Sequence, residues 1–156
     1  MPLSKIDQAI EATKDEEYLK GLTLFLDLYG TDAAPPIKNP KDARALSYFG
    51  VCLAMVHRKF KEAVELCKRA IDLEFYNGDH YANMARVYIA GNNRKKAFDV
   101  LEAGLKVASE NEALHAVRKA MGVRARPAVP FLNRTHPINV SLGQSRAAKK
   151  APSKKK

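Results

Sequence analysis

Two stretches decide the fold: Ala63-Val64-Glu65-Leu66-Cys67-Lys68-Arg69-Ala70 and Ala97-Phe98-Asp99-Val100-Leu101-Glu102-Ala103-Gly104. They superpose at an offset of 34 residues, and each has a small residue first, a larger one four positions later and a small one three further on. Residues with this spacing lie on one face of a helix. A fixed period of this length indicates stacked helical units, each of which needs neighbours to bury its apolar face.

The period and the positions of the small residues resemble the tetratricopeptide repeat. Residues 78–111 match that repeat best, because Tyr81, Met84, Ala85 and Tyr88 also fit its first helix. The resemblance implies an all-α fold, a right-handed α-solenoid of antiparallel helix pairs. We expect two to three repeats, a C-terminal capping helix and an irregular tail.

The unit at about 44–77 departs from the repeat in its first helix. Gly50 and Leu53 match the pattern only if the turn between the two helices has gained one residue, and we expect that insertion within 56–59. No proline starts the helix of the following unit, so Asp79 is the expected N-cap.

A degenerate unit at about 2–43 precedes these two. Its residues Gly21, Phe25 and Leu28 repeat the spacing of four and then three positions. Three prolines between residues 32 and 40 cannot lie inside a helix and predict an inserted loop. A capping helix is expected over 110–121, ended by Gly122. The predicted solenoid therefore spans 1–122.

The net charge of +10 belongs to the C-terminal part of the chain. Residues 1–121 hold 18 Lys and Arg against 17 Asp and Glu, whereas residues 122–156 hold 9 basic residues and no acidic one. We expect 123–143 to be an extended binding segment, with Arg124, Arg126, Phe131, Leu132 and Arg134 as its contact residues. Residues 144–156 are expected to be a disordered basic tail.

Cys52 and Cys67 fall within apolar helical patterns and lack metal-ligand spacing, so we expect buried, reduced thiols. No apolar run near the N-terminus is long enough for a signal peptide. A cytoplasmic location is the expectation from both observations.

Motifs of catalysis and cofactor binding are absent from the sequence, including the P-loop, the dinucleotide fingerprint, HExxH and paired cysteines. Its four histidines, His57, His80, His115 and His136, are far apart and are expected to be solvated or satisfied side chains. We therefore expect no enzyme activity, no cofactor and no metal site.

The resemblance implies a ligand groove lined by the first helix of each unit. Its candidate partner-binding residues are Tyr48, Phe49, Cys52, Asn83 and Arg86. An alternative stays open, in which Tyr48, Phe49 and Met55 are covered by the N-terminal unit and belong to the core.

The expected function is that of a non-catalytic adaptor, which binds a protein or peptide segment in the groove and makes a second contact through its tail. The alternative is a nucleic-acid- or ribosome-associated protein whose basic tail contacts phosphates. A membrane partner is disfavoured, because the tail lacks an amphipathic helix and a lipidation signal. The sequence does not indicate an oligomeric state.

Overall fold

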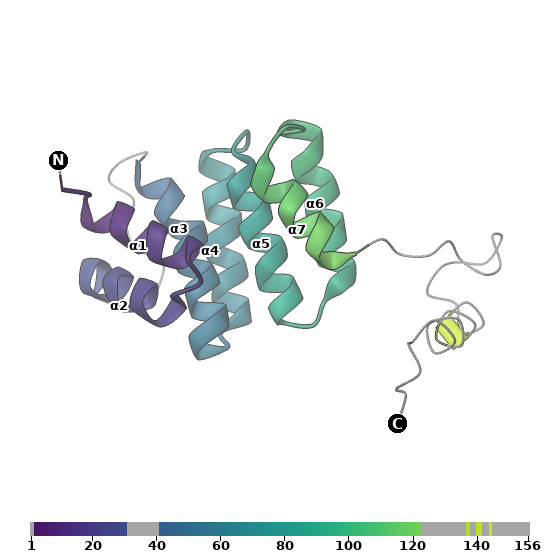
Figure 1. Cartoon of the computed structure of the whole chain (residues 1–156), viewed down its shortest axis with the longest axis horizontal. Helices are drawn as coiled ribbons and strands as arrows, with labels where there is room; N and C mark the ends of the chain where they lie inside the picture. The colour runs from purple at the N-terminus through teal and green to yellow at the C-terminus, as the bar shows by residue number, and fades with distance from the viewer. Residues whose placement is uncertain (1, 31–40, 123–136, 138–139, 142–143, 145–156) are drawn as a thin grey trace, which may run out of the picture. The chain divides into compact units, whose positions relative to one another are not determined.

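The computed structural model describes residues 2–30, 41–122, 137, 140–141 and 144. The chain divides into two units, Met1–Met121 and Gly122–Lys156, and the fold below is that of the first. Its elements are α1 (Lys5–Lys14), α2 (Tyr18–Tyr29), α3 (Lys41–Cys52), the π-helical turn η1 (Leu53–His57), α4 (Phe60–Leu73), α5 (Gly78–Ala90), α6 (Arg94–Val107) and α7 (Glu112–Met121) (Figure 1). The described residues contain no strand, which confirms the all-α prediction.

The helices pack as hairpins that stand side by side in chain order (Figure 1). α1 packs on α2, α3 on α4 and α5 on α6, while α3 also contacts both α1 and α5. α7 packs on α5 and α6. Among the described residues, no Cα atom of α2, α4 or α6 lies within 8 Å of a Cα atom of another of these three helices. The odd-numbered helices therefore form a continuous layer, and the even-numbered helices lie on it with gaps between them.

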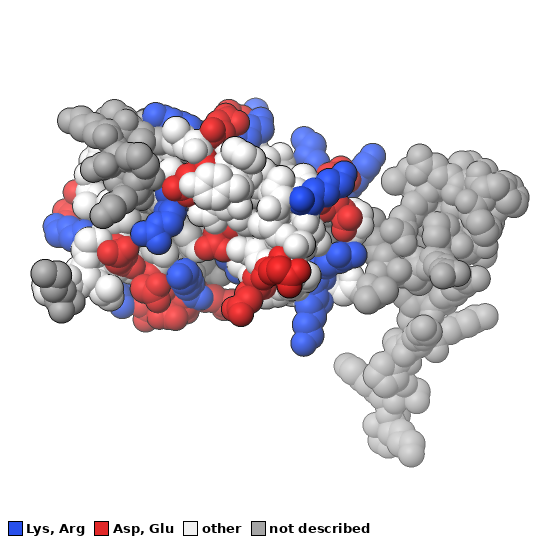
Figure 2. All heavy atoms as spheres, turned by 90° about the horizontal axis from the view of Figure 1, so that it is seen from above, with Lys and Arg blue, Asp and Glu red and all other residues white. Residues whose placement is uncertain are grey.

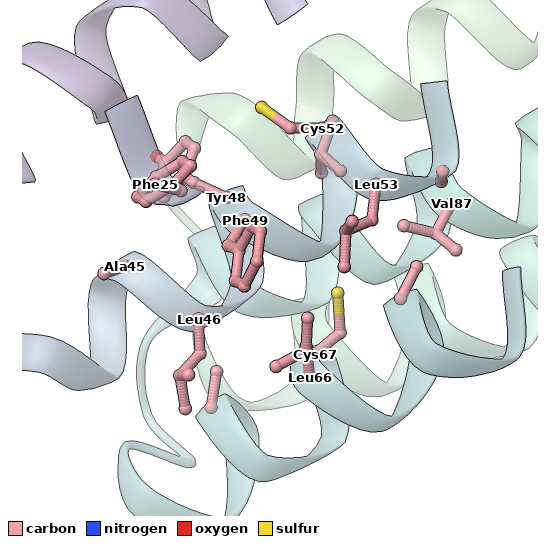
Figure 3. Close-up of a cluster of buried hydrophobic side chains, with 14 of the residues drawn as sticks. Phe25, Ala45, Leu46, Tyr48, Phe49, Cys52, Leu53, Leu66, Cys67 and Val87 are labelled. Atoms are coloured by element: carbon pink, nitrogen blue, oxygen red, sulfur yellow. The ribbon is translucent and has the colours of Figure 1, made fainter. Parts of the chain in front are cut away.

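Apolar side chains at helical spacing form the core between these layers. The larger buried cluster draws on α1 to α5, and Figure 3 shows its members Phe25, Phe49, Leu53 and Leu66 directed toward neighbouring helices. Full burial of one such side chain contributes about 1.5–3 kcal/mol. A second cluster joins α5, α6 and α7 through Ala82, Ala85, Ala97, Leu101, Leu114 and Val117.

Glycines allow the helices to approach closely where they cross, as the hairpins of α3 with α4 and of α5 with α6 show. A Cβ atom added to Gly50 would lie 2.8 Å from the backbone oxygen of Ala63, and one added to Gly104 would lie 2.7 Å from Cβ of Tyr81. Real Cβ atoms essentially never come so close. The close packing of α3 against α4 and of α6 against α5 therefore requires a residue without a side chain at Gly50 and at Gly104.

The hairpin of α3 and α4 has one residue more between corresponding repeat positions than the next hairpin. Gly50 and Ala63, which meet where α3 crosses α4, are separated by 13 positions, whereas the corresponding residues Ala85 and Ala97 are separated by 12. The π-helical turn Leu53–His57 absorbs the extra residue, and Arg58 then reverses the chain with a φ of 59°. A π turn is the usual way for a helix to hold one residue more.

Side chains of asparagine begin three of the helices. Asn77 Oδ1 accepts from the backbone N of Asp79 at 3.1 Å, so Asn77 caps α5 and the expectation that Asp79 would do so is wrong. Asn93 caps α6 and Asn111 accepts from Leu114 N in the same way.

The expected capping helix over 110–121 corresponds to α7, and Gly122 after it has a φ of 75°, which favours glycine. The expected inserted loop at 32–40 lies outside the described residues. So does most of the region 123–156.

Candidate protein-binding surfaces

A chain of buried hydrogen bonds links α3, α5 and the turn before α5. Asn83 Nδ2 donates to Ser47 Oγ at 3.1 Å, and Ser47 Oγ lies 2.9 Å from His80 Nδ1. The other ring nitrogen, His80 Nε2, lies 3.0 Å from Glu74 Oε2, which also accepts from Asn77 Nδ2 at 3.0 Å. We call this set the buried polar chain.

The partners fix the direction of each hydrogen bond. A carboxylate only accepts, so His80 Nε2 carries the proton and donates to Glu74, and His80 Nδ1 accepts from the Ser47 hydroxyl. Burial lowers the pKa of His80, although Glu74 opposes this effect, and the ring is neutral at neutral pH. Ser47 and His80 are both fully buried, so the geometry leaves the Ser47 hydroxyl no access to a substrate.

The buried polar chain ends at Arg86 on the surface. Arg86 Nη1 donates to Asn83 Oδ1 at 2.9 Å, while the side chain is half-exposed. Burial raises the pKa of both Tyr18 and Tyr48, and the guanidinium of Arg86 opposes that effect at each phenol. Arg86 therefore lies near both hydroxyls. It makes no ion pair in the described part of the chain, so its other N–H groups are available to an acceptor.

Asp79 connects this region to the neighbouring helices. Its carboxylate accepts from Tyr48 Oη at 3.2 Å and from Asn111 Nδ2 at 2.9 Å, so one half-exposed side chain of α5 contacts α3 and the turn before α7. We call the half-exposed residues Tyr18, Asp79 and Arg86 the Arg86 surface, and the buried Tyr48 lies beneath it. It presents one cation beside a phenol and a carboxylate that is already hydrogen-bonded.

Three of the predicted groove residues belong to the core. Phe49 and Cys52 are fully buried and Tyr48 is 4% exposed. The ring of Phe49 packs 5.4 Å from that of Phe25, and Cys52 Sγ lies 3.2 Å from Thr13 Oγ1. Because α1 and α2 cover this side of α3, the prediction that these side chains line an open groove is wrong. The alternative of a core position is correct for Tyr48 and Phe49, whereas Met55 is half-exposed.

The remaining predicted residues differ in their availability. Asn83 is 1% exposed and holds Arg86 in place, whereas Arg86 itself can reach a partner. The predicted tail contacts lie outside the described residues: Arg124, Arg126, Phe131, Leu132 and Arg134.

Both cysteines are free and buried, as expected from their positions. Burial raises the pKa of Cys52 to about 11 and that of Cys67 further, so neither is a thiolate at neutral pH. A protonated, enclosed thiol is a poor nucleophile and a poor metal ligand.

Sequence reasoning missed a groove between α4 and α6. Two cavities of about 570 and 210 Å³ lie there, both lined in part by Lys68, and residues of α5 form their floor. Six of the lining residues are half-exposed apolar or aromatic side chains: Phe60, Val64, Ile71, Tyr81, Tyr88 and Val100. We call this feature the α4–α6 groove. Its residues have the helical spacing of core positions, and their exposure follows only from the separation of α4 and α6.

In the part of the chain that the structure describes, no three His, Cys, Asp or Glu side chains are grouped to hold a metal ion. No helix there has the length and apolar character needed to cross a membrane. A scan against protein-family models and a search of curated proteins both gave no match.

Proposed function

We propose that this chain is a tetratricopeptide-type solenoid that works as a non-catalytic adaptor and binds a segment of a partner protein. Three features support the proposal: the 34-residue period, the stacked hairpins, and the small residues where helices cross. Proteins built from stacked repeats use their extended surfaces for recognition. Because one fold can serve many functions, the side chains on its surface determine what it binds.

Arg86 carries this proposal. Its guanidinium is fixed by Asn83, which is itself held by the buried polar chain, and it lies near two tyrosines. A cation that is already fixed loses little side-chain entropy when it meets an anion, and Arg is suited to pair with a carboxylate. Hydrogen bonds to a charged partner contribute about 1.5–3 kcal/mol.

The preferred ligand is a peptide segment with an acidic side chain next to apolar ones. Ile89 and Ala90 are half-exposed and lie three and four residues after Arg86, on the same face of α5. A carboxylate at Arg86 would bring neighbouring apolar side chains onto these two residues. Asp79 is already hydrogen-bonded to Tyr48 and Asn111. Its negative charge would disfavour a segment with further acidic residues on both sides of the one that binds Arg86.

Affinity capture from cell extract tests the proposal, with Arg86→Ala, Arg86→Lys and the matched control Arg69→Ala compared with the natural chain. Arg69 is also a half-exposed arginine, but it lies on α4. We expect proteins that the natural chain and Arg69→Ala retain to be lost with Arg86→Ala, with partial retention by Arg86→Lys. Identical sets of captured proteins with all four chains would contradict it.

We propose nucleic-acid binding by residues 122–156 as a second function. Acidic and basic side chains intermix over the face of the helical unit in Figure 2, in keeping with its 18 basic and 17 acidic residues. The 9 basic residues of 122–156 have no acidic residue among them, and such segments bind phosphates with a steep salt dependence. If deletion of 123–156 left retention on immobilised nucleic acid unchanged across a salt gradient, this second function would be wrong.

A further inference from the structure

The α4–α6 groove lies on the side of α5 that faces away from Arg86. Successive residues of an α-helix are rotated by about 100°, which places Asp79, Asn83 and Arg86 on one side of α5 and Tyr81 and Tyr88 on the other. The structure agrees, because Tyr81 and Tyr88 line the groove and Arg86 does not. A ligand in this groove would therefore leave the Arg86 surface free.

Two lysines at one end of the groove lack a carboxylate partner. Lys68 is paired with Glu65 at 3.0 Å, whereas Lys61 and Lys96 form no ion pair with any described residue. The ammonium of Lys96 lies 5.7 Å from the centre of the Tyr88 ring, and the guanidinium of Arg58 lies 4.7 Å from that of Phe60. These cations are held over the aromatic floor, where a bound segment would meet them.

The two ends of the groove differ in charge. Lys61 and Lys96 stand in the first turns of α4 and α6. Asp72 lines the opposite end. The groove therefore favours a ligand whose acidic residues are gathered at one end.

The size and polarity of the groove select a helical protein segment. Along α4 from Phe60 to Asp72 it extends for about 18 Å, which is the length of a helix of about three turns. An amphipathic helix places apolar side chains three and four residues apart, and these suit the lining side chains Phe60 and Val64 of α4 and Tyr88 of α5. Nucleic acid fits poorly, because Glu65 and Asp72 would repel its phosphates along the same path.

From these observations we infer that the α4–α6 groove binds an acidic amphipathic helix of a partner protein, with its acidic end beside Lys61 and Lys96. This inference does not depend on the proposed role of Arg86. The chain would then hold two protein segments on opposite sides of α5.

Phage display tests the inference, with the full chain as bait. The library holds random peptides that are long enough to form about three helical turns. We expect the enriched peptides to carry acidic residues near one end and apolar residues at helical spacing. Their affinities are then measured for Lys61→Glu/Lys96→Glu and for the control Lys95→Glu/Lys106→Glu, which makes the same charge change at exposed residues outside both cavities. Because Glu is favourable in the first turn of a helix, Lys61→Glu/Lys96→Glu should stay folded, and its thermal melt checks this.

Binding of the enriched peptides should weaken about tenfold or more with Lys61→Glu/Lys96→Glu and remain unchanged with the control pair and with Arg86→Ala. Equal loss with both lysine pairs, or no enrichment of acidic apolar peptides, would overturn the inference. Loss with Arg86→Ala alone would also overturn it, while supporting the function proposed for the Arg86 surface. Self-association that is abolished by Lys61→Glu/Lys96→Glu, seen by sedimentation at increasing concentration, would make a second copy the ligand and refute the inferred partner helix.

Discussion

The hydroxyl of Ser47 on α3 lies 2.9 Å from Nδ1 of His80 on α5, a contact between residues 33 positions apart. Both side chains are fully buried, so the hydrogen bond joins two consecutive hairpins in the interior. The same hydroxyl accepts from Asn83, whose oxygen accepts from Arg86. The packing of the hairpins and the position of the exposed guanidinium therefore depend on one set of hydrogen bonds.

Substitution of Ser47 by alanine should destabilise the fold. It leaves Asn83 Nδ2 and His80 Nδ1 without the hydroxyl that each contacts in the interior, and an unsatisfied buried polar group costs about 1–3 kcal/mol. Urea unfolding followed by circular dichroism measures the loss. Ser109→Ala, at an exposed serine, is the control and should change the free energy of unfolding by less than about 0.5 kcal/mol. Equal effects of the two substitutions would show that the buried polar chain adds nothing.

Stability should fall as the pH decreases below about 6.5, the usual pKa of histidine. Burial lowers the pKa of His80 in the folded state, so between that value and 6.5 the unfolded chain binds the extra proton. The stability from a neutral His80 is thus complete above pH 6.5 and is lost as the pH falls. Urea unfolding between about pH 7 and pH 5 gives the slope of the unfolding free energy against pH for the natural chain and for His80→Gln. If this slope were the same in both chains, the pH dependence would come from groups other than His80.

Gly50→Ala and Gly104→Ala should each destabilise the protein by about 1–3 kcal/mol, because the added methyl group overlaps a neighbouring helix. Gly91→Ala is the matched control, since its nearest neighbour, Phe60, would lie at an ordinary contact distance of 3.5 Å. Thermal denaturation of the three variants measures the difference. If Gly50→Ala and Gly104→Ala melted at or above the temperature of Gly91→Ala, the close helix crossings would not exist in solution.

Deletion of His57 should be tolerated. This exposed residue ends the π-helical turn, and its removal restores a separation of 12 residues between the crossing points of the hairpin. We expect the far-ultraviolet spectrum to be retained, with a stability loss of about 2 kcal/mol or less. Deletion of Glu65 within α4 is the contrast, because it rotates the rest of the helix by about 100° and exposes its buried face. Unfolding by both deletions would mean that the extra residue is not accommodated at η1.

The sequence was sufficient for the helical fold and for several local features. Ala63 and Ala97, which start the two matched stretches, are both fully buried, and Gly122 has the positive φ expected after a helix. The expected one-residue insertion at 56–59 overlaps the π-helical turn Leu53–His57. These features are local in sequence, so spacing and residue type were enough to find them.

Other features depend on contacts between distant residues. Tyr48 and Phe49 look like groove residues until α1 and α2 are placed over α3, and their amphipathic pattern is compatible with either role. The hydrogen bonds of His80 to Ser47 and Glu74 require three segments to meet, and no spacing rule predicts them. The α4–α6 groove was missed for the same reason, because a half-exposed apolar residue has the same helical position as a buried one.

Calorimetric titration with a captured partner tests most directly whether Arg86 contacts an acidic segment of that partner. The titration is carried out with the natural chain, Arg86→Ala and Arg69→Ala at low and high salt. Arg86→Ala alone should lose about tenfold or more in affinity and should show a weaker salt dependence. An affinity and a salt dependence that Arg86→Ala leaves unchanged would contradict such a contact.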